Sequence, residues 1–231
     1  FVRKTFNKEL ELAKEKKNFI LSVTHELKTP IASSKLFAET ILSRDISKEK
    51  RDDILDKIIK DQTRLEKLVE NILLISKVEE HQLHLEREKV NCHEFIESVI
   101  KGLDFSESTN FDIDAKIEIK VDRFYFTSVI QNLHENAIKY SQDKIGIVWS
   151  AQQLENSISI QIKDQGIGVP LNQREKIFNL FHRIGDENTR DTKGTGVGLY
   201  IVQKIIALHN GTIKAKENQP QGSIFEIELP Q

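Results

Sequence analysis

The N-terminal part of the chain carries a heptad pattern without glycine, and this pattern restricts it to long helices. Between Phe1 and Val78 there is no glycine, and Pro30 is the only proline. Apolar or small residues recur at alternating steps of three and four, which places them on one face of a helix. This seam comprises Phe6, Leu10, Ala13, Ile20, Leu27, Ile31, Ala38 and Ile41.

A second helix with the same pattern follows a polar interruption. The segment SRDISKEKRDD breaks the first series, and Ser47 is the predicted N-cap of the next helix. The second seam comprises Leu55, Ile58, Leu65, Val69 and Ile72. Two amphipathic helices joined by a short turn form an antiparallel hairpin. One hairpin cannot bury both apolar faces, so we expect a homodimer in which two hairpins form a four-helix bundle.

After about Glu80 the pattern changes to short strands, helices and glycine-rich turns. KIEIKV, IGIVWS, SISIQIKD, GTIKAKE and SIFEIELP alternate like strands, whereas FYFTSVIQNLHENAIKYS and VGLYIVQKIIALHNG have helical spacing, the second closed by Gly211. Interspersed helices and strands indicate an α/β two-layer sandwich. The sequence therefore predicts two domains, a helical hairpin over residues 1–80 and an α/β domain over residues 81–231.

Composition excludes several classes of protein. The net charge of -2 and the mixed surface charges argue against a nucleic-acid or membrane-surface binder. The single cysteine, Cys92, excludes an internal disulfide and suits a reducing compartment; a packing role is favoured for it over a reactive one. No apolar run reaches the roughly 20 residues of a membrane span. Because the chain lacks methionine altogether, we expect it to be a cytoplasmic piece of a longer protein, whose anchoring in a membrane stays open.

The first candidate motif is FILSVTHELKTPI, around His25. His25 lies one step beyond the seam, so its ring should reach solvent, with Glu26 next to it and Thr29 one turn further on. An imidazole is nucleophilic near neutral pH, and a neighbouring carboxylate can orient it or take up its proton. Such a histidine is usually surface decoration. However, Pro30 costs a helix about 3 kcal/mol and should bend it by removing the bond to the Glu26 carbonyl, and broken local rules tend to mark functional sites.

The second motif is NLHENAIKYS. Asn132 and Asn136 lie four residues apart on one helix face, with Lys139 one turn further on. Amide oxygens suit Mg²⁺, and lysine supplies a charge for phosphate. The alternative is an amphipathic helix with polar decoration.

Two glycine-rich motifs complete the set. DQGIGVP directly follows a strand; its glycines allow a ligand to approach the backbone, and Asp164 can accept from an amino group such as that of adenine, although a simple turn is the alternative. KGTGVGLYIVQKI leads glycines into a helix N-terminus, which is an anion site, and the preceding HRIGDENTRDTK could act as a mobile lid. A lone glycine-rich loop is weak support for nucleotide binding.

In this order the motifs resemble the transmitter region of sensor histidine kinases of two-component systems. FILSVTHELKTPI resembles the family's phospho-acceptor box, NLHENAIKYS its asparagine box, and DQGIGVP, IFNLFHRIG and GTGVGLYIV its first glycine, phenylalanine and second glycine boxes. The resemblance implies a dimerisation and histidine-phosphotransfer hairpin followed by a Bergerat-type ATP-binding domain. It also implies ATP and Mg²⁺ as cofactors and the receiver domain of a response regulator as partner.

The resemblance further implies a role for each matching residue. His25 would be the autophosphorylated nucleophile, Glu26 its orienting or proton-accepting partner, and Thr29 the residue that positions a water for phosphatase activity. Asn136 would hold Mg²⁺, assisted by Asn132. The other implied nucleotide contacts are Lys139 and Tyr140 (phosphate and ribose), Asp164 (adenine), Gly166 and Gly168 (room for the base), Arg183 (γ-phosphate), and Gly194, Thr195, Gly196, Gly198 and Leu199 (phosphate tail).

Two rival functions stay open at this point. The chain could be a Bergerat-type ATPase that drives dimer motion without phosphorylating itself, or a scaffold that only recruits a response regulator. His134 and Tyr200 depart from the residues usual in the family at those positions and could alter packing behind the nucleotide. His81 and His84 have a spacing that permits a metal, but a surface pair is the more common explanation.

Overall fold

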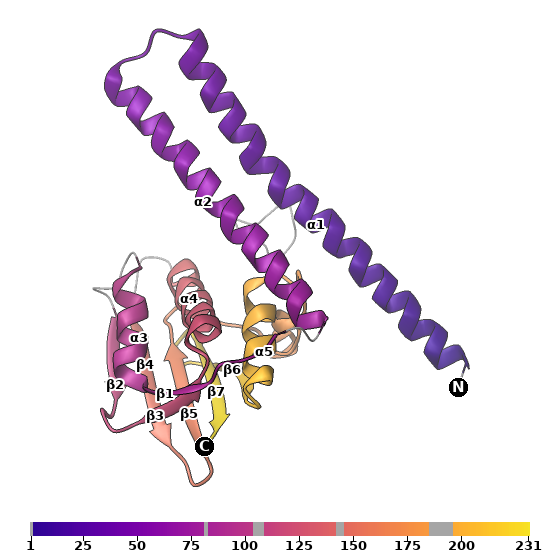
Figure 1. Cartoon of the computed structure of the whole chain (residues 1–231), viewed down its shortest axis with the longest axis vertical. Coiled ribbons are helices and arrows are strands. Elements are labelled where there is room, and N and C mark those ends of the chain that lie inside the picture. Colours follow the sequence, from indigo (N-terminus) through magenta and orange to yellow (C-terminus); the bar gives the residue numbers. More distant parts are fainter. Residues whose placement is uncertain (1, 81–82, 104–108, 142–145, 185–195) are drawn as a thin grey trace. The chain divides into compact units, whose positions relative to one another are not determined.

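The computed structural model describes residues 2–80, 83–103, 109–141, 146–184 and 196–231, with the backbone alone for 2–16, 18 and 19. It divides the chain into two compact units, Phe1–Glu80 and His81–Gln231 (Figure 1), which are described separately below. None of the described helices is long and apolar enough to cross a membrane.

The first unit is a hairpin of two long helices, α1 (Val2–Ser43) and α2 (Lys48–Glu79). The predicted N-cap is confirmed, because the Ser47 side chain accepts from the Lys50 N–H at 3.4 Å. α1 is assigned as helix without interruption on both sides of Pro30, and the bend expected at this residue stays a prediction. Pro30 is buried, and the burial of its ring offsets part of the cost of the missing hydrogen bond.

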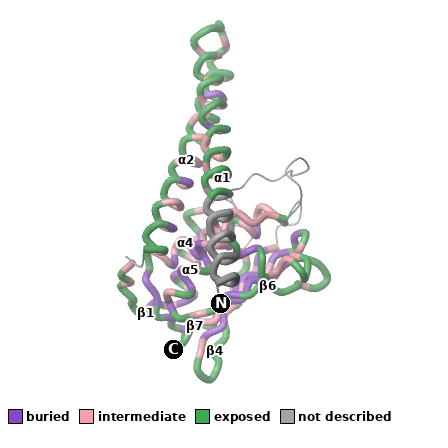
Figure 2. Tube along the Cα trace, turned by 90° about the vertical axis from the view of Figure 1, so that its right-hand side faces the viewer, coloured by how far each residue is buried: buried purple, intermediate pink, exposed green. Residues whose placement is uncertain are grey.

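Among the hairpin residues whose side chains the structure describes, few are buried within one chain. Ile54, Leu68 and Ile75 are buried along α2, whereas the predicted seam residues Leu55 and Val69 remain 44% and 46% exposed. Figure 2 shows the described part of the hairpin as largely exposed. Its exposed large apolar residues are Ile20, Leu21, Ile31, Leu36, Leu42, Leu55, Ile59, Val69 and Leu73.

The second unit is built on a five-stranded sheet of order β2-β4-β5-β7-β6. Its strands are β2 (Thr109–Ile113), β4 (Ile147–Gln153), β5 (Ser157–Lys163), β7 (Ser223–Pro230) and β6 (Thr212–Glu217). The β2–β4 pair is parallel and the other pairs are antiparallel. A separate antiparallel pair joins β1 (Glu88–Asn91) and β3 (Glu118–Val121).

Three helices cover one face of this sheet (Figure 1): α3 (Cys92–Lys101), α4 (Arg123–Tyr140) and α5 (Gly198–Leu208). Two short 3₁₀ turns, η2 (Leu171–Gln173) and η3 (Lys176–Phe178), lie between β5 and α5 in the chain. Trp149, Phe126 and Leu133 are among the fully buried side chains of the layer between helices and sheet. This arrangement confirms the predicted fold class, a helical hairpin followed by an α/β two-layer sandwich.

The end of α5 differs from the sequence prediction. The residue in the left-handed conformation is Asn210, with φ 60°, and not Gly211. The N–H of Gly211 donates to the Ile206 carbonyl at 2.9 Å. A Cβ at Gly211 would lie 2.5 Å from the Glu228 carbonyl oxygen, so glycine is needed there because β7 approaches closely.

Candidate functional site

His25 lies on α1 and is exposed, as its position beside the seam predicts. The neighbouring Glu26 carboxylate is paired with Arg64 of α2, with 2.6 Å between Oε2 and Nη2. The Glu26 and Arg64 side chains are only 16% and 32% exposed, so this ion pair is partly shielded from solvent. The Thr29 hydroxyl donates to the His25 carbonyl at 3.3 Å. Arg64 therefore fixes the carboxylate that follows the candidate nucleophile.

Asp164, at the end of β5, is 3% exposed and is held by backbone donors. Its Oδ1 accepts from the N–H of Gly166 at 2.8 Å and from the N–H of Ser223 at 3.1 Å. Burial raises the pKa of this carboxyl group, and the two backbone hydrogen bonds oppose that shift. Both bonds fall on one oxygen, so within the described part of the chain Oδ2 is left to accept from a ligand.

The loop after Asp164 is pressed against the C-terminal end of α4. The Ile167 N–H donates to the Tyr140 carbonyl at 3.2 Å. A Cβ at Gly166 would lie 2.3 Å from that same carbonyl oxygen, so only glycine allows this approach. Gly168 has φ 74°, a conformation that favours glycine. The loop thus joins Asp164 to the end of the asparagine-bearing helix.

The N-terminus of α5 meets the middle of α4. A Cβ at Gly198 would lie 2.4 Å from Oδ1 of Asn132, whose Nδ2 donates to the Ser128 carbonyl at 2.8 Å. The amide oxygen of Asn132 therefore faces the start of α5. Just before that helix, Gly196 has φ 69° and accepts from the Phe181 N–H at 2.9 Å. Backbone contacts thus tie the second glycine motif to the segment after η3.

Two further predicted residues lie at the end of α4. Lys139 donates through Nζ to the Tyr140 hydroxyl oxygen at 3.2 Å and lies 4.8 Å from the centre of that ring. Asn136, Lys139 and Tyr140 are all partly exposed, as a site open to ligand requires.

The structure brings part of the predicted nucleotide-binding set into contact. Contacts link Asn132 to Gly198, Tyr140 to Gly166, and Gly166 to Asp164. Arg183 follows η3 and Leu199 lies in the first turn of α5, both half-buried. Gly194 and Thr195, and the lid expected around them, lie outside the described residues.

Sequence reasoning missed the turn between β6 and β7. Asn218 donates from Nδ2 to the main-chain carbonyl of Asp164 at 2.7 Å, and Ser223 donates to its side chain. Gly222 has φ 117°, and a Cβ there would lie 2.0 Å from the Asp164 carbonyl oxygen. Gly222, directly before SIFEIELP, could have indicated this turn, but a glycine before a strand is equally typical of an ordinary turn.

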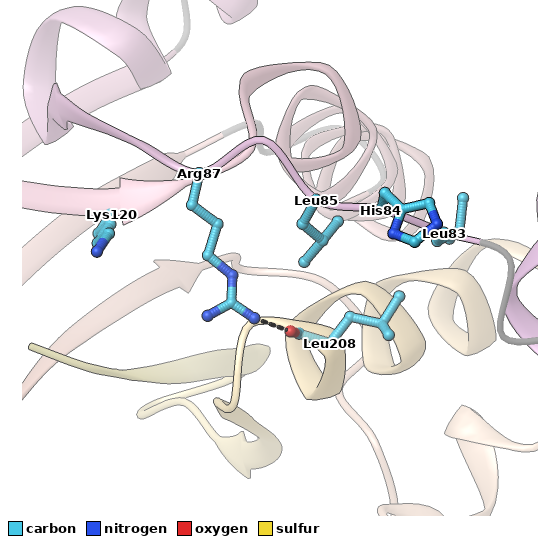
Figure 3. Close-up of a pocket in the computed structure, with 6 residues that line it drawn as sticks. All are labelled: Leu83, His84, Leu85, Arg87, Lys120 and Leu208. Atoms are coloured by element: carbon cyan, nitrogen blue, oxygen red, sulfur yellow. Dashed lines mark hydrogen bonds between the residues drawn. The ribbon is translucent and has the colours of Figure 1, made fainter.

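A separate hollow of about 530 Å³ lies elsewhere on this unit (Figure 3). It is lined by Leu83, His84, Leu85, Arg87, Lys120 and Leu208, none of which is a predicted nucleotide residue. The Arg87 guanidinium points to the end of α5, where Nη2 donates to the Leu208 carbonyl at 2.5 Å. Among the described residues no group of three or more His, Cys, Asp or Glu side chains could hold a metal, so His84 gains no partners of this kind there. His81 lies outside the described residues.

Comparison with known proteins identifies both units. Residues 15–81 match the family model of the His Kinase A (phospho-acceptor) domain. Residues 121–231 match the family of histidine kinase-, DNA gyrase B- and HSP90-like ATPases. Fold and site thus define a phospho-acceptor hairpin followed by an ATP-binding domain.

Relatives and solved structures agree with that class. The sensor protein kinase WalK of Staphylococcus aureus is 33% identical over 227 residues, which are 95% of this chain and 55% of that relative. In strain JH9 the same alignment covers 37% of the relative, so the chain spans about half or less of the length of these proteins. A histidine kinase of Acinetobacter baumannii, AdeS, superposes with TM-score 0.71 at 25% identity, covering 89% of this chain and 97% of that one. The chain belongs to the sensor histidine kinases.

Proposed function

We propose that this chain phosphorylates itself on His25 with ATP and passes the phosphoryl group to an aspartate of a response regulator. The observation that carries the proposal is the exposed His25 in a phospho-acceptor hairpin, in the same chain as an ATP-binding unit with a buried Asp164 beside a glycine loop. Two solved relatives add support for the fold and its partners. One is described as the histidine kinase ThkA in complex with the response regulator protein TrrA (TM-score 0.69, 23% identity), and another, ShkA, as a complex with AMPPNP (20% identity).

In this proposal the ATP-binding unit recognises the adenine base and binds the phosphates. Asp164 accepts from the adenine amino group through Oδ2, while Gly166 and Gly168 leave room for the base. Lys139 and Tyr140 contact phosphate and ribose, and Arg183 reaches the γ-phosphate. The phosphate tail is wrapped by Gly194, Thr195, Gly196, Gly198 and Leu199.

The donor set on α4 fits a hard cation. Asn132 has its amide nitrogen bonded to Ser128, which leaves its amide oxygen facing the start of α5, and Asn136 is partly exposed one turn further on. Amide oxygens of this kind suit Mg²⁺, so Asn136 would hold it with the help of Asn132. When bound, the ion would neutralise charge on the phosphate oxygens.

The chemistry at His25 is an in-line displacement. A ring nitrogen of His25 forms a bond to the γ-phosphorus, the bond from that phosphorus to the bridging oxygen of ADP breaks, and ADP leaves. Such transfers depend on positioning and on charge stabilisation, which Arg183 and the backbone donors of the glycine motifs supply. Glu26, fixed by Arg64, orients the imidazole or takes up its proton. The phosphoryl group then passes to an aspartate of the receiver domain.

A second activity, phosphatase action on the phosphorylated regulator, is part of the proposal. Thr29 lies one turn from His25, and its hydroxyl hydrogen bond of 3.3 Å is long enough to exchange readily for water. Thr29 would then position the water that attacks the phospho-aspartate.

The decisive experiment is incubation of the chain with Mg²⁺ and γ-labelled ATP. We expect a protein-bound label that is acid-labile and alkali-stable, that is lost in His25→Gln, and that moves to a receiver domain. ATP hydrolysis without such a label would point instead to an ATPase that does not phosphorylate itself. Absence of Mg·ATP binding would point to a scaffold.

A further inference from the structure

The turn between β6 and β7 is hydrogen-bonded to both the main chain and the side chain of Asp164. The Asn218 side chain donates to the Asp164 main-chain carbonyl at 2.7 Å. Ser223 donates its N–H to Oδ1 at 3.1 Å, and the Asp164 N–H donates back to the Ser223 carbonyl at 3.0 Å. The main chain and the side chain of Asp164 are therefore both located by this turn, which lies more than fifty residues away in sequence.

The turn is itself fixed and fits closely against Asp164. The Asn218 N–H donates to the Gly222 carbonyl at 3.1 Å, which closes the turn. Gly222 packs so tightly against the Asp164 carbonyl that a Cβ would lie 2.0 Å from its oxygen. At the other end of the glycine loop, Arg174 donates to the Val169 carbonyl at 3.1 Å and pairs with Glu217 at 3.3 Å. The loop is thus braced by residues of the β6–β7 region at both ends.

We infer that Asn218 is a positioning residue for adenine recognition, acting through the backbone of Asp164. The inference rests on the proposed function, in which Asp164 reads the adenine amino group. Asn218 acts without touching the nucleotide. Its side-chain amide is half-buried and neutral and donates to the Asp164 carbonyl. This bond fixes the main chain of Asp164 and thereby the position of its carboxylate.

The inference predicts an effect on base selectivity. The exocyclic amino group of adenine donates to a carboxylate, whereas the hypoxanthine of ITP has a carbonyl oxygen at the same position and cannot. A poorly positioned Asp164 therefore weakens ATP binding, while ITP binding, which never gained from that hydrogen bond, changes little. A general loosening of the turn would weaken both nucleotides equally.

The test measures the binding of ATP and of ITP to the whole chain by calorimetry. We expect Asn218→Ala to weaken ATP about 5- to 20-fold, in keeping with the loss of one partly buried hydrogen bond, and to change ITP binding less than about twofold. Asn218→Gln, which retains a donor, should recover part of the ATP affinity. Gln221→Ala is the matched control, because Gln221 is an exposed amide in the same turn with no hydrogen bond to a described residue. In an Asp164→Ala background, Asn218→Ala should add little further loss.

The outcomes separate this inference from the proposed function. If Asp164→Ala leaves ATP binding unchanged, the proposed adenine site is wrong. If Asp164→Ala weakens ATP but Asn218→Ala does not, or if Asn218→Ala weakens ATP and ITP equally, the role of Asn218 is refuted while the adenine site stands. Thermal unfolding of each variant identifies any loss that comes from a less stable fold.

Discussion

Several glycines of the ATP-binding unit lie where a Cβ would meet backbone, and Gly166 offers a direct test. A Cβ there would lie 2.3 Å from the Tyr140 carbonyl oxygen and 2.8 Å from its carbon, so backbone must move. We expect Gly166→Ala to lower the free energy of unfolding by about 1–3 kcal/mol, the usual cost of overpacking, and to weaken ATP binding. Urea titration measures the first effect.

Gly102 provides the control for that substitution. Its nearest neighbour for a Cβ is 3.5 Å away, and its φ is -82°, so alanine fits without strain. Gly102→Ala should leave stability unchanged or raise it by up to about 1 kcal/mol. Equal losses for the two variants would show that the approach of Gly166 to Tyr140 is not what requires glycine.

Cys92 is the one thiol of the chain, and its surroundings make it inert. It is fully buried, and burial raises the pKa of the thiol to about 12. Because the thiolate is the reactive form, we expect no modification of the folded protein by a thiol reagent at pH 8, and one equivalent after denaturation. Rapid labelling of the folded protein would contradict the packing role.

At the scale of residues, the sequence revealed those that act through local motifs. Asp164, Gly166 and Gly198 could be singled out because they stand in short motifs, one directly after a strand and one at the start of a helix. Arg64 and Asn218 could not, because each acts on a partner 38 or 54 residues away and neither residue type is unusual at its own position.

At the scale of elements, two buried histidines make α4 and α5 sensitive to acid. His134 is fully buried on α4: its Nδ1 accepts from Trp149 at 3.4 Å, and Nε2 has no partner among the described residues. His209, just after α5, accepts the Asp122 N–H on Nε2 at 2.9 Å and donates from Nδ1 to the Ile205 carbonyl. Burial lowers the pKa of both imidazoles.

The expected pH dependence follows from the direction of these shifts. With the folded pKa below the unfolded value of about 6.5, the unfolded chain binds more protons as the pH falls below 6.5, so stability decreases there. We expect the urea midpoint of the ATP-binding unit to drop between pH 7.5 and pH 5.5, and His134→Leu to reduce that drop. His84→Gln, at an exposed position, is the control and should keep the wild-type slope. A slope unchanged by His134→Leu would contradict the assignment.

Elements that lie in clearly periodic stretches of sequence were predicted, and three others were missed. The five strands with clear alternation and the helices around NLHENAIKYS and VGLYIVQKI correspond to β3–β7, α4 and α5. The sequence did not reveal β1, β2 and α3. β1 has four residues and β2 five, and their pairing with β3 and β4 is what makes them strands; β3 is as short, but it lies in the longer alternating stretch KIEIKV.

At the scale of the whole molecule, the hairpin exposes apolar side chains that one chain does not cover. Leu36 is 62% and Ile59 61% exposed in an isolated chain. Burial of such residues against a second hairpin would stabilise the proposed homodimer. We expect Leu36→Glu with Ile59→Glu to shift the protein to monomer in sedimentation experiments, since buried charges oppose association.

Leu171→Glu supplies the control for the dimer. Leu171 is 78% exposed but belongs to the second unit, so this variant should remain dimeric. Dissociation by Leu171→Glu and not by the hairpin variants would place the subunit interface elsewhere.

The segment at the start of the ATP-binding unit is hydrogen-bonded to the ends of two helices. Arg87 donates to the last carbonyl of α5 (Figure 3), and the Glu86 N–H donates to Asp122, the N-cap of α4, at 2.8 Å. Asp122 in turn donates to His209. The opposite portions of these helices supply the amide oxygens and the glycine-led N-terminus proposed to hold the phosphates. Glu86 and Arg87, neighbours in the chain, therefore connect the two helices that carry the proposed phosphate-binding groups.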